Sequence, residues 1–117
     1  MRLEALKFLY DVLQACDLLE EFTKGRSFEE YLDDPLLQSA VERQFIIVGE
    51  ALFHALRIDP EIEKAITDAT LIVGFRHVMV HGYASIKPET VWGVVDEELA
   101  TLRREVDSLL ASAESAR

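Results

Sequence analysis

The residues of this chain best suited to chemistry lie in the short segment 74–83, GFRHVMVHGY. Arg76 supplies a fixed cationic fork that matches the oxygen atoms of a phosphate. His77 and His81 can each donate or accept a proton near neutral pH. Tyr83 adds a phenol that can form hydrogen bonds or be modified. These groups are suited to binding a phosphate and to moving a proton beside it.

The spacing between Arg76 and His81 decides whether both can act on one group. On an unbroken helix the two residues lie about 140° apart, at roughly 100° per residue, and so they do not share one face. Two arrangements could still bring them together. The helix end could unwind at Gly82 and turn His81 round, or a two-fold axis could join two copies of the chain in one composite cleft.

The elements that must position this segment are predicted to be helices. Apolar residues recur three and four positions apart along nearly the whole chain, which is typical of amphipathic helices. The expected helices cover about 3–23, 28–32, 35–57 and 68–81, with one more from Pro88 toward the end, a helical turn at 61–66 and a loop at 84–87. No strand pattern, internal repeat or linker is present. The sequence therefore predicts an all-α, antiparallel four- to five-helix bundle.

Local signals mark several of the helix ends. Gly25 closely follows the first helix, and Ser27 with Glu30 has the spacing of a capping box. Pro35 suits the first turn of the long third segment, with Asp33 or Asp34 as its cap. Gly82 suits a left-handed cap at the end of helix 68–81. We expect one domain over 1–117, with 114–117 frayed.

The charge and the cysteine content limit the class of protein. The formal net charge of −10 argues against a passive nucleic-acid-coating protein, although an enzyme could still touch RNA through a small local site. The single cysteine, Cys16, allows no intrachain disulfide and is consistent with a reducing compartment. No apolar run approaches the roughly 18 residues of a membrane span. We therefore expect a cytoplasmic protein that is not in a membrane.

The motif and several other segments resemble one family. RHVMVHGY is similar to the Arg-x4-6-His motif of the HEPN superfamily, and more narrowly to the Arg-x4-His-x-Tyr form of HepT-type toxins. The opening helix, the short acidic helix after Gly25, AVERQFIIVGEAL at 40–52 and VWGVV at 91–95 also resemble that family. The resemblance covers nearly the whole chain.

The resemblance implies the toxin half of a toxin–antitoxin pair. Such a toxin is a metal-independent endoribonuclease without a cofactor, and it acts as a homodimer that brings two motifs to a shared cleft. Arg76 would bind the scissile phosphate and stabilise its developing charge. His81 would be the general acid or base, and the expected product is a 2′,3′-cyclic phosphate. His77 would support the site, at a position where the family commonly has asparagine.

The resemblance also implies a means of silencing. In HepT-type toxins the motif tyrosine is adenylylated by a minimal nucleotidyltransferase antitoxin, MntA. Tyr83 would be the acceptor here. The added AMP is a bulky anion, which would block RNA by charge and by size.

Three alternatives come from the same residues. His77 with His81, and Glu50 with His54, have the four-residue spacing that can hold a metal, but further ligands are not evident and none is expected. Glu50 lies among apolar residues and needs a partner, for which Arg43 or a second subunit is available. Finally, the chain could be a non-catalytic helical module that binds a nucleotidyltransferase. RNA cleavage in the presence of a chelator would distinguish the enzyme from the module.

Overall fold

The computed structural model describes residues 1–115, with the exception of the Tyr83 side chain. Over these residues all of the regular structure is helical, which confirms the predicted all-α bundle. The elements are α1 (Leu3–Thr23), α2 (Phe28–Leu32), α3 (Pro35–Ile58), the 3₁₀ helix η1 (Pro60–Ala65), α4 (Ala69–His81), the 3₁₀ helix η2 (Tyr83–Ser85), α5 (Pro88–Glu97) and α6 (Leu99–Ser115). In this part of the chain no helix is long and apolar enough to cross a bilayer.

The predicted signals at the early helix ends act as expected. Gly25 has a φ of +73° in the turn after α1. The Ser27 hydroxyl accepts a hydrogen bond from the Glu30 N–H, and the Glu30 carboxylate accepts one from the Ser27 N–H, which completes the capping box. Asp34 caps α3 by accepting a hydrogen bond from the Leu37 N–H at 3.0 Å. These short-range contacts set the boundaries of α2 and α3.

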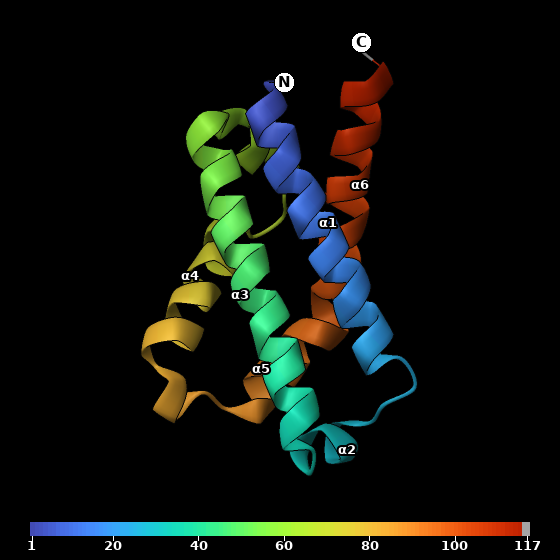
Figure 1. The fold of residues 1–117 in the computed structure, drawn as a ribbon, viewed down its shortest axis with the longest axis vertical. Helices are drawn as coiled ribbons and strands as arrows, with labels where there is room; N and C mark the ends of the chain where they lie inside the picture. The colour runs from blue at the N-terminus through green and yellow to red at the C-terminus, as the bar shows by residue number, and fades with distance from the viewer. Residues whose placement is uncertain (116–117) are drawn as a thin grey trace.

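The long helices pack side by side along the molecule (Figure 1). α1 and α3 are antiparallel and form the central pair. α6 lies against α1, and α4 lies against α3. α2 and α5 close the lower end in the view of Figure 1, where they contact each other. This arrangement leaves the segment 74–83 at the outer edge of the bundle, on α4 and in the turn after it.

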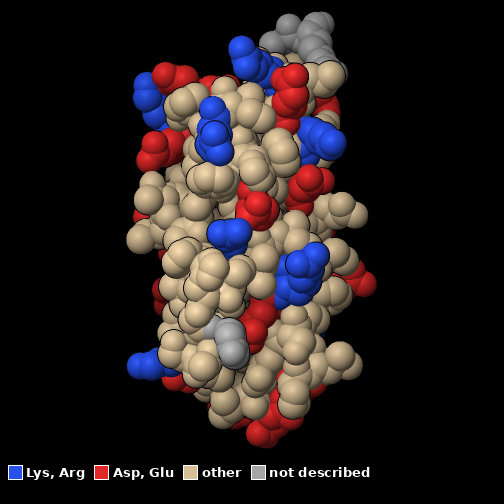
Figure 2. Space-filling view, turned by 60° about the vertical axis from the view of Figure 1, so that its left-hand side comes forward, with Lys and Arg blue, Asp and Glu red and all other residues tan. Residues whose placement is uncertain are grey.

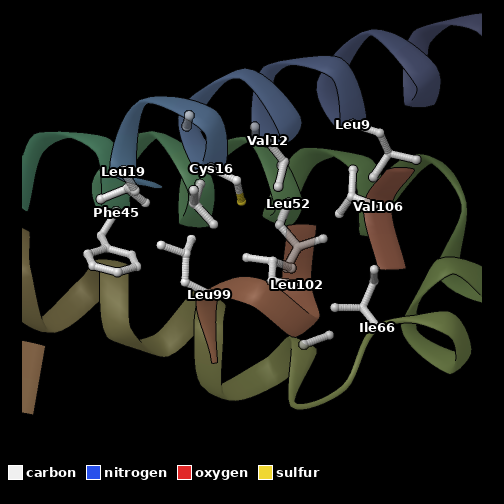
Figure 3. Packing of buried hydrophobic residues seen from close by; sticks show 14 of the residues in the cluster. Leu9, Val12, Cys16, Leu19, Phe45, Leu52, Ile66, Leu99, Leu102 and Val106 are labelled. Atoms are coloured by element: carbon white, nitrogen blue, oxygen red, sulfur yellow. The ribbon is translucent and has the colours of Figure 1, made fainter. Parts of the chain in front are cut away.

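The core lies between α1, α3 and α6 (Figure 3), and η1 packs on α3 at one end of it. Side chains from all three helices converge there and are almost completely buried: Leu9, Val12, Cys16, Leu19, Phe45, Val48, Leu52, Leu99, Leu102 and Val106. A second contact joins α2 to α5, because the rings of Tyr31 and Trp92 lie 5.1 Å apart. Burial of this apolar surface is the main stabilising contribution to the fold.

The prediction of one long final helix is wrong. The chain forms α5 and α6, which meet at Glu98, whose N–H bonds back to the Val94 carbonyl. Trp92 packs on Tyr31 at the end of the bundle, whereas Leu102 and Val106 pack in the core between α1 and α3. One straight helix could not reach both places, so the chain changes direction between them.

Two smaller expectations near the motif also need correction. Residues 83–85 form a 3₁₀ turn, although 84–87 was expected to be an irregular loop. Gly82 has a φ of −105°, so it is not a left-handed cap. A Cβ atom there would lie 2.9 Å from the Val78 carbonyl oxygen, and this crowding explains the glycine. At the other end of the chain, Glu114 and Ser115 belong to α6, and 116–117 lie outside the described residues.

Candidate active site

The motif begins on the last turns of α4, which the sequence builds from an almost continuous apolar run between Ala69 and His81. Asp68 precedes the helix in a left-handed conformation, with a φ of 56°. At the other end, the Gly82 N–H donates to the Val78 carbonyl at 2.7 Å. Helical hydrogen bonding therefore continues past His81, and the expected alternative in which the helix end unwinds to turn His81 round is not observed.

Arg76 lies where α4 comes closest to α3. A Cβ atom added to Gly49 would lie 2.2 Å from the Cβ atom of Arg76, so the two helices approach at this point only because residue 49 has no side chain. The Arg76 side chain is 31% exposed. Its aliphatic part therefore packs on α3 while the guanidinium reaches the surface.

The guanidinium is paired with Glu50. Arg76 Nη2 lies 2.7 Å from Glu50 Oε2, which makes the two side chains an ion pair. The other carboxylate oxygen, Glu50 Oε1, lies 3.0 Å from His54 Nε2. Arg43 was the expected partner of Glu50 within the chain, and that expectation is wrong because Arg76 is the partner observed. The three side chains form one continuous row from α4 to α3.

His54 contacts two aromatic rings while its side chain stays 39% exposed. It stacks on Phe8 of α1 with ring centroids 5.0 Å apart, and it meets the edge of Phe53 at 5.5 Å. These contacts restrict the rotation of the imidazole, as expected for a satisfied bundle residue.

His77 and His81 lie one turn apart on α4 and are both exposed. Their ring centroids are 4.5 Å apart, with planes tilted by 45°. The structure thus brings the two histidines into contact with each other, whereas Arg76 is paired with Glu50. Within one copy of the chain, Arg76 and His81 remain separated by about 140° around the helix, as the sequence predicts.

The surface around the motif carries mixed charge. Figure 2 turns the α4 side of the molecule forward, and on this face Lys and Arg side chains lie singly among acidic and neutral ones. They do not form a continuous basic track of the kind that binds nucleic acid without sequence preference. A phosphate reaching this face would depend on individual cations such as Arg76.

Comparison with known proteins identifies the family. A model of the "Ribonuclease HepT-like" family matches residues 12–109. The chain is 30% identical to "Probable ribonuclease HepT" of Thermococcus cleftensis, over 87% of this chain and 92% of that protein. The chain belongs to the ribonuclease HepT-like family. Family membership supports ribonuclease function for this HepT-like chain.

Two further relatives carry similar names. "Putative RNase TTE0752" of Caldanaerobacter subterraneus is 30% identical over 88% of the HepT-like chain and 91% of its own length. "Putative RNase MJ1380" of Methanocaldococcus jannaschii is 28% identical over 86% of the chain and 91% of its own length. No solved structure matches the chain.

Two further questions about this HepT-like site concern the modified tyrosine and a metal. The Tyr83 side chain, the expected modification site, lies outside the described residues. For a metal, the two spaced pairs Glu50–His54 and His77–His81 each contact internally. Within the part of the chain that the structure describes, no group of three or more His, Cys, Asp or Glu residues could hold a metal ion together.

Sequence reasoning missed the connection between α3 and the motif. Gly49 and Glu50 are adjacent in the sequence, followed by His54 one turn later, and only the packing of α3 against α4 links them to Arg76. The available signal was a glycine directly before a carboxylate in an apolar helix. That pattern indicates a close helix contact beside a charge that needs a partner.

Proposed function

We propose that this HepT-like chain is the toxin of a toxin–antitoxin pair, acting in the cytoplasm as a metal-independent endoribonuclease. The observation that carries the proposal is the family match over residues 12–109, which contains the whole Arg-x4-His-x-Tyr motif. The placement of Arg76 and His81 at an accessible end of α4 is consistent with it. The acidic net charge is compatible with an enzyme that engages RNA through a small site.

In this mechanism the RNA supplies its own nucleophile. The 2′-hydroxyl attacks the neighbouring phosphorus while the bond to the 5′-oxygen of the next nucleotide breaks, leaving a 2′,3′-cyclic phosphate. One imidazole accepts the proton of the 2′-hydroxyl, and a second donates a proton to the leaving oxygen. The guanidinium of Arg76 stabilises the negative charge that builds up on the phosphate oxygens. His77, whose ring contacts His81, would support the orientation of the catalytic imidazole.

A homodimer would supply the two imidazoles. Each chain has a single motif histidine at position 81, and Arg76 and His81 of one copy point in different directions around α4. Leu71 and Val78 are 70% and 48% exposed and lie two turns apart on the same side of α4, as expected for a face that packs on a second copy. We therefore propose that a two-fold axis near α4 forms the shared cleft.

Silencing would act through Tyr83. A minimal nucleotidyltransferase antitoxin of the MntA type would transfer AMP from ATP to the phenol oxygen and release pyrophosphate. The attached phosphodiester places a negative charge and an adenosine beside the motif, where an RNA phosphate has to bind. Mass spectrometry of the protein co-expressed with such an antitoxin should find one added AMP in the peptide that contains Tyr83, and none in Tyr83→Phe.

The central experiment measures RNA cleavage by the purified protein in EDTA. The wild type should cleave RNA and leave 2′,3′-cyclic phosphate ends. Arg76→Ala and His81→Ala should each lower the rate by roughly 10²- to 10⁴-fold, because each removes one catalytic group. The same substitutions should relieve growth arrest when the chain is expressed alone. Equal toxicity of wild type and variants would rule out these catalytic roles.

The acidic charge favours one other candidate, a non-catalytic helical module that binds the nucleotidyltransferase. A net charge of −10 suits docking to a basic protein and needs no RNA contact. This module would bind the nucleotidyltransferase but leave RNA intact in the same EDTA assay, so one measurement separates the two functions.

A further inference from the structure

Glu50 links the motif arginine to a histidine on another helix turn. One carboxylate oxygen, Oε2, is ion-paired with Arg76 Nη2 at 2.7 Å, and the other, Oε1, lies 3.0 Å from His54 Nε2. Because a carboxylate only accepts hydrogen bonds, the Nε2–H of His54 is the donor. The carboxylate is therefore fixed at both oxygens, and its position depends on His54 as much as on Arg76.

The pairing leaves part of the guanidinium available. Glu50 is paired with Arg76 at Nη2. The Nε–H of Arg76 is buried, with no hydrogen-bond acceptor among the described residues. Because the Nε–H is buried, an incoming phosphate has to bind the Nη groups of this side chain, which is 31% exposed. The ion pair therefore orients the guanidinium and still leaves it N–H donors for a phosphate.

Packing contacts support Glu50 from behind. His54 is stacked on Phe8 and touched by Phe53, and these two contacts limit the rotation of its imidazole. On the other side, the contact between Gly49 and the Arg76 Cβ atom fixes where the arginine leaves α4. Both ends of the arginine side chain are therefore restrained, the Cβ atom by packing and the guanidinium by the carboxylate.

The ion pair is too exposed to contribute much to folding. The side chains of Arg76 and Glu50 are 31% and 46% exposed. Ion pairs at such surfaces contribute little to stability because water and salt screen them. Substitutions at Glu50 should therefore leave the fold intact, so that an effect on the reaction can be measured separately.

We propose that Glu50, held by His54, is a positioning residue that sets the orientation of the Arg76 guanidinium toward the scissile phosphate. This inference rests on the proposed ribonuclease function. It predicts a loss in kcat without a rise in KM. Losing the carboxylate should misplace the guanidinium in the transition state and lower kcat, whereas losing its negative charge should not weaken the binding of an RNA polyanion.

The experiment compares kcat and KM in variants of Glu50 and His54. Glu50→Gln should lower kcat by roughly 10- to 100-fold with KM for RNA unchanged or reduced. His54→Ala should lower kcat less, and His54→Gln should restore most of it because the glutamine amide can donate to Glu50 Oε1 in place of the imidazole. Glu42→Gln, the same change on the same helix, is the matched control and should keep the wild-type kcat.

The results separate this inference from the proposed function. If the wild type cleaves RNA, Arg76→Ala does not, and Glu50→Gln has the wild-type kcat, the positioning role is wrong and the nuclease assignment stands. If the wild type does not cleave RNA, the ¹⁵Nε–¹Hε NMR signal of Arg76, assigned by its loss in Arg76→Lys, still tests the restraint. Faster exchange of this proton with water in Glu50→Gln and His54→Ala supports it, and unchanged exchange contradicts it.

Discussion

Cys16 and Tyr31 are buried side chains whose acidic protons are hard to remove. Burial, with smaller contributions from the carboxylates of Asp17 and Glu20 and against an opposing effect of Arg103, raises the pKa of the Cys16 thiol from its ordinary 9.0 to about 12. Burial also raises the pKa of Tyr31, with a smaller contribution from the negative charge of Glu42. Both side chains are therefore neutral in the folded chain at physiological pH.

For Cys16 this shift predicts a loss of stability at alkaline pH. Above pH 9.0 the unfolded thiol ionises while the folded thiol keeps its proton to about pH 12, so the unfolded state gains stability as pH rises. The free energy of unfolding should fall by about 1.4 kcal/mol per pH unit over this range from this group alone. Urea unfolding at a series of pH values measures the slope.

Cys16→Ala is the control, because it removes the thiol and leaves every other titrating group. Its stability should decline less steeply above pH 9.0 than that of the wild type. Equal slopes in the two proteins would show that the folded thiol ionises as readily as the unfolded one.

At the scale of the elements, the contact between α3 and α4 requires a residue without a side chain at position 49. It brings the backbone of α3 at Gly49 against the Cβ atom of Arg76, where there is no space for another carbon atom. Because Arg76 Cβ is fixed to the helix backbone, it cannot move away as the end of a long side chain could. The spacing of the two helices and the position of the arginine are therefore set together.

Gly49→Ala should force α3 and α4 apart. We expect a loss of about 1–3 kcal/mol in the free energy of unfolding, only partly offset by the higher helix propensity of alanine. RNA cleavage should fall as well, since Arg76 moves with α4. Urea unfolding and the cleavage assay measure the two effects.

Gly93→Ala provides the comparison on α5. A Cβ atom there would meet nothing within 4 Å, so alanine should be neutral or stabilise the helix by up to about 1 kcal/mol. If Gly49→Ala were as stable as Gly93→Ala, the helices would be free to separate without cost, and the close contact would not fix the arginine.

At the scale of the whole molecule, the α4 side combines exposed apolar residues with a hollow. Leu71, Val78 and Val80 are the exposed large apolar residues of α4, and Leu71 is the most exposed of them. Beside it, a hollow of about 230 Å³ lies between α3, α4 and the α5–α6 region, lined mainly by apolar side chains such as Phe45, Phe75 and Val94. Such a surface is suited to receiving side chains from a second copy.

This surface predicts which substitutions weaken the proposed homodimer. Leu71→Glu and Val78→Glu place a charge on the face and should shift the protein from dimer to monomer in analytical ultracentrifugation, with RNA cleavage falling in parallel. Leu36→Glu is the control, because Leu36 is also exposed but lies in the first turn of α3. A wild type that is monomeric at every concentration and still cleaves RNA would exclude a shared cleft.

The sequence by itself determined the helices and the chemistry-bearing residues. The Ser27–Glu30 capping box, the Asp34 cap and Pro35 act over a few residues, so α2 and the start of α3 were predictable from local pattern. The segment 76–83 was likewise recognisable, because its residue types and their spacing are properties of the sequence alone.

Only the tertiary structure decided what surrounds Arg76 and where the last helix divides. Arg43 lies nearer to Glu50 in the sequence, but the α3–α4 contact places Arg76 beside it. The last segment divides into α5 and α6 at Glu98 because Trp92 packs on Tyr31 while Leu102 packs in the core. The apolar periodicity of this segment would also fit one continuous helix. The physical reason is the same in both cases: periodicity specifies which face of a helix is apolar, whereas partners are chosen by the way distant segments pack together.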